Sequence, residues 1–286
     1  MDFLKEDLVK SPLNYTGGKF KLLPQILPLF PNDINTFIDL FTGGCNVGVN
    51  VKANKIVCND TETAVIDLLN NLKSLTSKAA LDKVKKTVDK YGLSKTNEEG
   101  YKKIRKDYNK GDKTWYMFYS MLTHAFNYQI GFNKQGEYNQ SFGRNRSSFN
   151  KSLEKNFIKF VDRLNNLNIE FLNKNFSEFK MDNLANGDFI YCDPPYLITN
   201  ANYNKSAKWN EEKERELLNL LDKLNEKGIS FALSNVLESK GNSNDILKEW
   251  SKKYNIHYLD YSYANCNYCK KDKSNNAIEV LITNYT

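Results

Sequence analysis

The sequence has 286 residues, of which 40% are hydrophobic and 26% are charged, a composition typical of a globular protein with a full core. This composition excludes a disordered or fibrous chain, and no apolar run approaches the roughly 20 residues of a membrane-spanning helix. The net charge of +7 is uneven, because residues 71–155 hold 18 Lys or Arg against 8 Asp or Glu. A basic segment in an otherwise slightly acidic chain favours a polyanionic partner such as nucleic acid.

Residues 1–10 alternate charged and isolated apolar residues without a signal-peptide pattern, so a cytoplasmic protein without a membrane partner is expected. Five cysteines without regular spacing argue against a disulfide framework. Cys266 and Cys269 form one close pair, but a zinc site would need further ligands nearby, and the chain has two histidines. No metal site is predicted.

Two short elements are predicted near the start of the chain. Residues 19–30 carry apolar residues at helical spacing, but Pro24 and Pro28 keep this helix short or irregular. Residues 36–41 are predicted to form a buried strand whose only charge is Asp39.

A candidate ligand site follows the first strand. Gly43 and Gly44 form a turn that lets the backbone approach a ligand, and a helix is expected from about residue 46. A second strand at residues 55–58 leads to Asp60, and an acid at such a strand tip suits the hydroxyls of a ribose. Because the Gly-x-Gly-x-x-Gly pattern is missing, NAD is the weaker candidate ligand. The alternative, in which the acids only cap strand ends, stays open.

After a helix at residues 61–75, the alternation of strands and helices stops between residues 76 and 168. Lysine-rich helices are predicted first, and the aromatic residues of 115–126 are interpreted as core. Residues 127–149 are rich in amides, and the turn at residues 134–137 predicts a hairpin. Amides and arginines suit contacts with bases and phosphates, although an ordinary surface loop is an equal alternative. The candidate DNA-binding residues are Asn133, Lys134, Arg144 and Arg146.

The alternation of strands and helices then returns. Strands are predicted at residues 169–172, 187–192, 229–233, 255–263 and 277–284, and the last two are expected to form an antiparallel pair. A helix between the second and third of these strands is predicted to begin after Asn210 and to end at Gly228.

The buried strand at residues 187–192 stops at Asp193-Pro194-Pro195-Tyr196. Prolines have no N–H for a sheet, so the chain must turn outward there. The carboxyl ends of parallel strands are where ligands bind in α/β proteins. A carboxylate, carbonyl oxygens and an aromatic ring suit a planar base whose amino group is held by its hydrogens.

This tetrad is similar to the catalytic tetrad of DNA methyltransferases that modify amino groups, and the chain resembles the Dam-like, D12 class of adenine-N6 methyltransferases over nearly its whole length. The other fragments that carry the resemblance are residues 14–19, 37–44, 59–60, 233–235 and 279–285. The resemblance implies a Rossmann-like SAM-dependent (S-adenosylmethionine-dependent) α/β fold with a mixed seven-strand sheet. It also implies a catalytic SAM-binding domain at 1–75 and 169–286, split at 76–168 by a helical and β-hairpin target-recognition domain.

The resemblance assigns roles to individual residues. The implied catalytic residues are Asp193, Pro194, Pro195 and Tyr196. The implied SAM-binding residues are Tyr15, Lys19, Asp39, Gly43, Gly44, Asp60, Asn175, Phe176 and Asp193. Many relatives carry Asp where Asn175 stands, so its contact with the SAM adenine is expected to be weakened.

The implied reaction is methyl transfer from SAM to adenine N6 in double-stranded DNA after base flipping, by a bacterial or phage-encoded monomer or weak dimer. Enzymes of this family that read GATC carry an Arg where Gly131 stands, which favours a different short site or a guanine contact from Arg144 or Arg146. Methylation of cytosine N4 or of RNA adenine, and an inactive DNA-binding relative, remain as alternatives.

Overall fold

The computed structural model describes residues 8–15, 17–111, 113–179, 182–198, 209–260 and 277–286. Its centre is one mixed sheet with the strand order β3-β2-β1-β4-β5-β8-β7, to which β6 adds a short pairing with β5. The strands are β1 (Thr36–Asp39), β2 (Lys55–Asn59), β3 (Ile169–Leu172), β4 (Phe189–Cys192), β5 (Ser230–Ser239), β6 (Asn242–Ser243), β7 (Asn255–Leu259) and β8 (Ile278–Thr283). The predicted Rossmann-like α/β fold with a mixed seven-strand sheet is confirmed.

The direction of the strands divides this sheet in two. The five strands from β3 to β5 are parallel, whereas β8 runs antiparallel to β5 and β7 runs antiparallel to β8. The predicted antiparallel pair at the end of the chain is therefore confirmed. Strand β5 extends to Ser239, well past the predicted end at residue 233.

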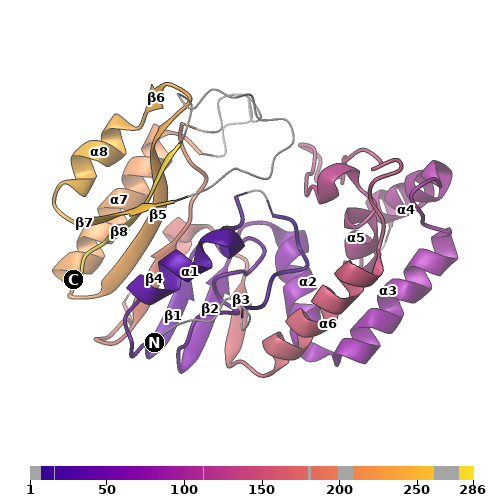
Figure 1. The fold of residues 1–286 in the computed structure, drawn as a ribbon, viewed down its shortest axis with the longest axis horizontal. Coiled ribbons are helices and arrows are strands. Elements are labelled where there is room, and N and C mark those ends of the chain that lie inside the picture. Colours follow the sequence, from indigo (N-terminus) through magenta and orange to yellow (C-terminus); the bar gives the residue numbers. More distant parts are fainter. Residues whose placement is uncertain (1–7, 16, 112, 180–181, 199–208, 261–276) are drawn as a thin grey trace.

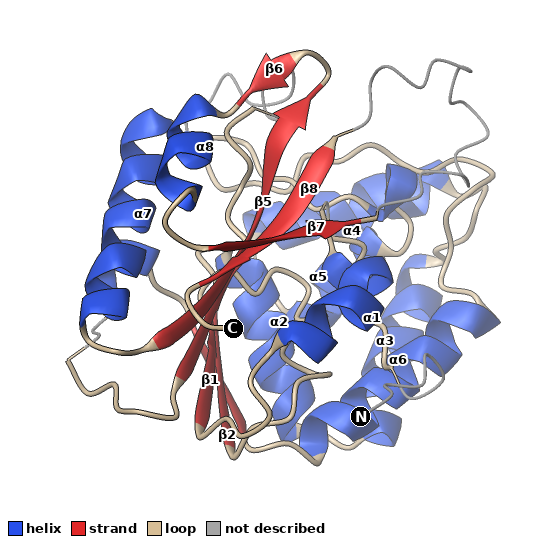
Figure 2. Cartoon of the chain, turned by 60° about the vertical axis from the view of Figure 1, so that its left-hand side comes forward, coloured by secondary structure: helices blue, strands red, loops and turns tan. Residues whose placement is uncertain are grey.

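Both faces of the sheet are buried, which explains its nearly continuous apolar strands. Successive side chains point to opposite faces, so Phe37 packs in one hydrophobic cluster and Ile38 in the other. Helices α7 (Glu211–Glu226) and α8 (Asp245–Ser251) cover one face, and α1 (Leu23–Ile26) and α2 (Thr63–Ser74) lie on the other (Figure 2).

Four helices lie between α2 and β3 in the sequence and gather at one end of the molecule (Figure 1). They are α3 (Ser77–Tyr91), α4 (Glu98–Lys110), α5 (Trp115–Leu122) and α6 (Lys151–Asn165). Trp115, Phe118 and Tyr119 of α5 are buried, as predicted, while Tyr116 is half-buried, and Phe118 lies in the same cluster as Leu69 of α2. The inserted segment therefore shares a core with the sheet domain.

The short elements agree with the sequence in most places. The irregular N-terminal helix is confirmed as η2 (Lys19–Leu22), α1 and η3 (Leu27–Leu29). Helix α7 begins after Asn210, whose side chain accepts the Lys213 N–H, and Gly228 ends it with φ 71°. Two further 3-10 turns are η4 (Phe126–Tyr128) and η5 (Phe176–Glu178).

The helix expected from about residue 46 is wrong, because residues 43–50 form consecutive turns. The side chains of Asn46 and Asn50 accept N–H groups of Ser11 and Val9 at 2.9 and 2.8 Å, which fastens the N-terminal segment to these turns. Asparagine side chains that bond to nearby backbone compete with helix formation. The turns keep Gly43 and Gly44 packed against the N-terminal segment.

The predicted hairpin is present as two isolated antiparallel bridges, Phe132 to Tyr138 and Ala125 to Phe142. At its tip the Asn133 N–H donates to the Glu137 carbonyl oxygen at 2.9 Å, and Gly136 has φ 72°. Regular strands are not formed there within the described residues.

Candidate active site

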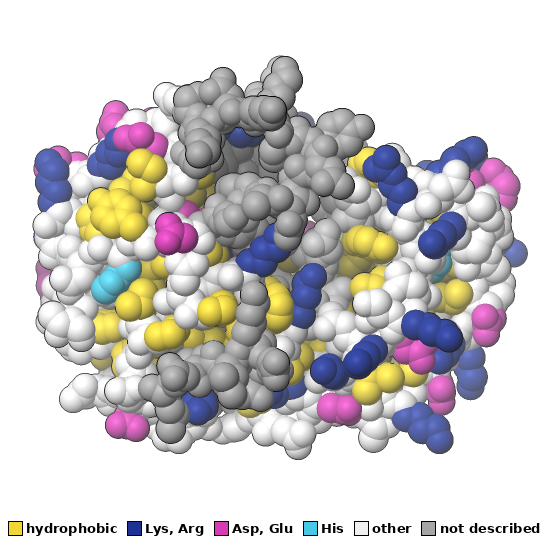
Figure 3. Space-filling view, in the orientation of Figure 1, with side chains coloured by type: hydrophobic (Ala, Val, Ile, Leu, Met, Phe, Trp, Pro, Cys, Tyr) yellow, Lys and Arg dark blue, Asp and Glu magenta, His cyan; other side chains and the backbone are white. Residues whose placement is uncertain are grey.

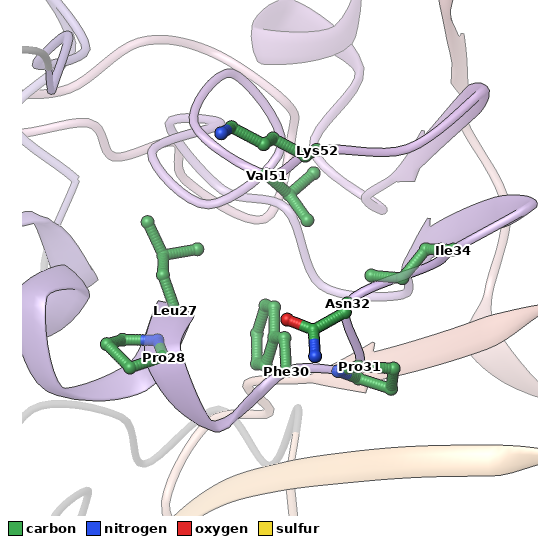
Figure 4. A pocket seen from close by; sticks show the side chains of 8 residues that line it. All are labelled: Leu27, Pro28, Phe30, Pro31, Asn32, Ile34, Val51 and Lys52. Atoms are coloured by element: carbon green, nitrogen blue, oxygen red, sulfur yellow. The ribbon is translucent and has the colours of Figure 1, made fainter. Parts of the chain in front are cut away.

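The candidate site lies where β2, β1 and β4 end. These parallel neighbours bring Asp39, at the end of β1, between Asp60 and Asp193, which follow β2 and β4. A hollow of about 110 Å³ beside Phe30, Ile34 and other residues (Figure 4) lies before the start of β1, at the opposite edge of the sheet. Because ligands of parallel α/β sheets bind at the carboxyl ends, we place the site around the three acids.

Asp193 is held by a lysine from the N-terminal segment. The Lys19 ammonium nitrogen lies 2.7 Å from Asp193 Oδ1 and donates to the Gly17 carbonyl oxygen at 3.0 Å. The Lys19 side chain is only 4% exposed, and that of Asp193 is 17% exposed. Burial raises the pKa of Asp193, and the attraction of Lys19 opposes this rise. Lys19, predicted beside the cofactor, thus contacts the predicted catalytic carboxylate.

Tyr196 and a second buried acid complete this cluster. The Tyr196 hydroxyl lies 3.2 Å from Asp193 Oδ1 and 3.1 Å from Glu279 Oε1. Glu279 belongs to β8, and its Oε1 is 3.7 Å from the Lys19 ammonium. The lysine nitrogen also lies 4.9 Å from the centre of the Tyr196 ring. Sequence reasoning gave Glu279 no role, although an acid within an apolar strand was a usable signal.

The two prolines differ in their surroundings. Pro194 is buried directly behind Asp193, and Pro195 is exposed. The structure therefore brings Asp193, Pro194 and Tyr196 into one cluster, and places Pro195 at its surface.

Asp60 fastens the glycine turn to the tip of β2. Its Oδ2 accepts the Gly43 N–H at 2.8 Å, and its Oδ1 accepts the Glu62 N–H at 2.9 Å. These two bonds hold the Asp60 carboxylate at the tip of β2, facing the glycine turn. Gly43 has φ 48°, and a Cβ there would lie 2.9 Å from the ring of Tyr15, which covers the turn.

Asp39 is the most deeply buried of the three acids. Burial raises its pKa to about 8, and the nearby charge of Asp193 adds to this effect. Asp39 Oδ1 and Thr42 Oγ1 are two of the five buried side-chain atoms without a hydrogen-bond partner in the described part of the chain, although the nearby Thr42 hydroxyl partly opposes the rise in the pKa of Asp39. Buried polar atoms are nearly always satisfied, so this pair fits a ligand with N–H donors. The ammonium group of SAM has such donors.

An aromatic cluster lies beside this edge. The ring centre of Phe176 lies 5.4 Å from that of Phe41 and 5.5 Å from that of Trp209. The Trp209 Nε1–H donates to Glu214 Oε2 at 2.7 Å. The Asn175 side chain begins η5 by accepting the Ser177 N–H at 3.2 Å. Sequence reasoning missed Trp209, which lies 13 residues after Tyr196 in the sequence.

The predicted DNA-binding residues fall into two groups in the chain, Asn133 and Lys134 at the hairpin turn and Arg144 and Arg146 after it. Asn133 Oδ1 accepts the N–H groups of Gln135 and Glu137 at 3.0 and 2.9 Å, so its side chain shapes the hairpin turn. Lys134 is exposed at the same turn. Exposed Arg144 forms an ion pair with Glu98 of α4.

Arg146 and Phe126 form a second exposed group on the inserted segment. The Arg146 guanidinium lies 5.7 Å from the centre of the Phe126 ring, which is 42% exposed. The next residue, Asn127, has φ 53°, and its carbonyl oxygen accepts from Asn14 Nδ2 at 2.8 Å. This bond links the insert to the segment that carries Lys19. Sequence reasoning assigned Phe126 to the core, and its exposure corrects that interpretation.

On the face in Figure 3, Lys and Arg side chains are more frequent over the half that holds α3–α6. Within the described ranges, none of the helices is both long enough and apolar enough to cross a membrane. Cys266 and Cys269, which were interpreted as too few for a zinc site, lie outside the described residues.

Comparison with known proteins gives a family match over most of the chain. The sequence pattern of the D12 class N6 adenine-specific DNA methyltransferases matches residues 15–265. The chain is 48% identical over 282 residues to the type II methyltransferase M.FokI of Planomicrobium okeanokoites, and 46% identical over 283 residues to the modification methylase StsI of Streptococcus sanguinis. Each alignment covers 97% of this chain but 43% of the relative, so the chain spans less than half of their length.

A more distant relative has a similar length. The chain is 24% identical over 258 residues to the DNA adenine methylase of Escherichia coli strain K12, and the alignment covers 86% of both proteins.

Proposed function

This chain belongs to the family of D12 class N6 adenine-specific DNA methyltransferases, and we propose that it transfers a methyl group from SAM to adenine N6 at a specific site in double-stranded DNA. The observation that carries the proposal is the half-buried Asp193 directly after β4, held by Lys19 and Tyr196. A carboxylate fixed in this way can accept hydrogens from an amino group at one defined place.

Adenine N6 is a weak nucleophile because its lone pair is delocalised into the ring. Lys19 and Tyr196 both contact Oδ1 of Asp193. Among the described residues, no hydrogen bond is made to Oδ2 of Asp193. We therefore propose that this oxygen accepts one amino hydrogen and that the Pro194 carbonyl oxygen accepts the other. These acceptors draw the nitrogen toward tetrahedral geometry, which directs its lone pair outward. As the new N–C bond forms, the amino proton becomes acidic and passes to Asp193 or to water.

A paired base is out of reach of this cluster, so the adenine must leave the helix. We assign the Tyr196 ring to stack on the flipped base. The exposed residues Lys134, Arg144 and Arg146 are proposed to contact DNA, with residues 76–168 as the target-recognition domain. Asn133 is assigned to shaping the hairpin rather than to direct contact.

The SAM site is proposed along the edge from Asp60 to Phe176. SAM supplies an electrophilic methyl group when it is bound. Asp60 would accept the ribose hydroxyls, and Asp39 with Thr42 would accept from the ammonium group. Phe176 and Asn175 would hold the adenine ring and its amino group, while Tyr15, Gly43 and Gly44 shape the neighbouring turn.

The proposal is tested by incubating the purified protein with SAM and, separately, double-stranded DNA and RNA. Mass spectrometry of the nucleosides should show N6-methyladenine from DNA, and the product should disappear with Asp193→Ala. N4-methylcytosine, or methylation of RNA alone, would support the alternative substrates. SAM binding without turnover on any DNA would indicate an inactive relative.

A further inference from the structure

Glu279 is a buried carboxylate that the proposed mechanism does not use. It is the only acid in β8, its side chain is 8% exposed, and it lies within reach of both groups that hold Asp193. Burying a carboxylate is costly unless it is paired, so its presence beside another acid requires an explanation.

The two acids draw on the same hydrogen-bond donors. The Tyr196 hydroxyl has one hydrogen, yet its oxygen lies 3.2 Å from Asp193 and 3.1 Å from Glu279. It therefore donates fully to only one of them at a time. The Lys19 ammonium is likewise 2.7 Å from Asp193 and 3.7 Å from Glu279. One cation and one hydroxyl thus serve two carboxylates.

This sharing affects the strength of Asp193 as an acceptor. A buried ammonium 2.7 Å away favours the ionised carboxylate and weakens its attraction for other hydrogens. A second negative charge, 3.7 Å from the same ammonium, acts in the opposite direction. Without Glu279, Asp193 would be the one carboxylate of this pair left to accept from Lys19 and the Tyr196 hydroxyl.

We propose that Glu279 is a positioning residue for methyl transfer, which shares Lys19 and the Tyr196 hydroxyl with Asp193 and so keeps Asp193 a strong acceptor for the amino hydrogens. This role rests on the proposed function, because it concerns the same reaction. Glu279 also holds Lys19 in place when Asp193 takes up the amino proton, because the buried ammonium then still has a charged partner.

The charges around the pair are consistent with this role. Burial raises the pKa of Glu279, Lys19 lowers it, and Asp193 raises it further. Beyond the groups already named, Asp193 interacts electrostatically with four ionisable residues. They are Asp39 of β1, Tyr191 and Cys192 of β4, and Tyr15 of the N-terminal segment. Burial raises the pKa of Tyr191 and keeps that hydroxyl protonated, and Glu279 adds a smaller rise, so the removed charge acts chiefly on Asp193 and Lys19.

The first test needs no DNA. Glu279→Gln keeps the size and an acceptor oxygen but removes the charge, so the pKa of Asp193 should fall. Carbon-13 NMR of labelled aspartate carboxyls would follow its titration, with Asp193→Asn used to identify the signal. Asp188→Asn is the matched control, because Asp188 is also buried but lies before β4, at the opposite end of the strand from Asp193. An Asp193 titration that is the same in Glu279→Gln and in wild type would overturn the proposal.

The second test is kinetic. Glu279→Gln should lower kcat roughly tenfold, with KM for SAM and for DNA nearly unchanged, because the change acts on the acceptor strength of Asp193 and not on binding. The acidic limb of the kcat profile should move to lower pH, and Glu279→Asp should recover part of the rate. A raised KM with normal kcat in Glu279→Gln would contradict the proposal. An equal loss of kcat in Glu279→Gln and Glu279→Asp would also contradict it. If wild type methylates no DNA, the proposed function fails, and the NMR titration still decides the role of Glu279.

Discussion

Removing the Asp193 carboxylate is the most direct perturbation of the site. Asp193→Ala would delete the acceptor for the amino hydrogens and the partner that lies 2.7 Å from the Lys19 ammonium. Loss of a transition-state acceptor of this kind costs on the order of 100-fold or more in rate. We therefore expect single-turnover methylation of duplex DNA to fall by at least this factor.

The same change has a second, structural consequence. The Lys19 ammonium would keep the Gly17 carbonyl oxygen at 3.0 Å and Glu279 at 3.7 Å, so its charge would remain paired, but less closely. Loss of one buried charged partner with another remaining should cost about 1–3 kcal/mol in the free energy of unfolding. Chemical denaturation would measure this loss, and the variant should remain folded at room temperature.

Two binding measurements separate chemistry from folding in this experiment. Asp193→Ala should bind DNA nearly as wild type does in fluorescence anisotropy, and calorimetry should still detect SAM binding. Asp188→Asn is the matched control, since it alters a buried acid at the other end of β4 and should keep activity. Turnover of Asp193→Ala within tenfold of wild type would refute the catalytic assignment.

Three further predictions concern the other parts of the site. Asp60→Ala should raise the SAM dissociation constant roughly tenfold or more in calorimetry, through lost ribose contacts and a loosened Gly43 turn; unchanged affinity would move the SAM site elsewhere. Arg144→Ala or Arg146→Ala should weaken DNA binding or alter the methylated sequence found by single-molecule sequencing, and methylation of GATC alone with both variants fully active would contradict this. The pKa of Asp39, raised to about 8 in the folded protein, means that the unfolded chain loses this proton at lower pH. The free energy of unfolding without SAM should therefore fall as pH rises from roughly 4 to 8. Asp39→Asn should lack this part of the pH dependence in denaturation curves, and identical slopes would disprove the assignment.

The sequence by itself determined the elements whose signals are local. An apolar run that stops at Asp193-Pro194 predicts a strand end, because prolines cannot continue a sheet. Asn210 and Gly228 predicted both ends of α7, since a side-chain cap and a left-handed residue act within one turn of the helix. The helix expected from about residue 46 failed because its asparagines bond to Ser11 and Val9, far away in the sequence.

The tertiary structure alone decided which groups surround the catalytic carboxylate. Lys19 precedes the first strand, Asp193 follows β4, and Glu279 lies on β8, so no local pattern relates them. They meet because β5 lies between β4 and an antiparallel β8, and because the N-terminal segment crosses the carboxyl edge of the sheet. The composition of each strand shows that it is buried but not which strand will be its neighbour. For this reason the sequence predicted Asp193 as the acceptor and Lys19 as a cofactor ligand, and the fold placed Lys19 between Asp193 and Glu279.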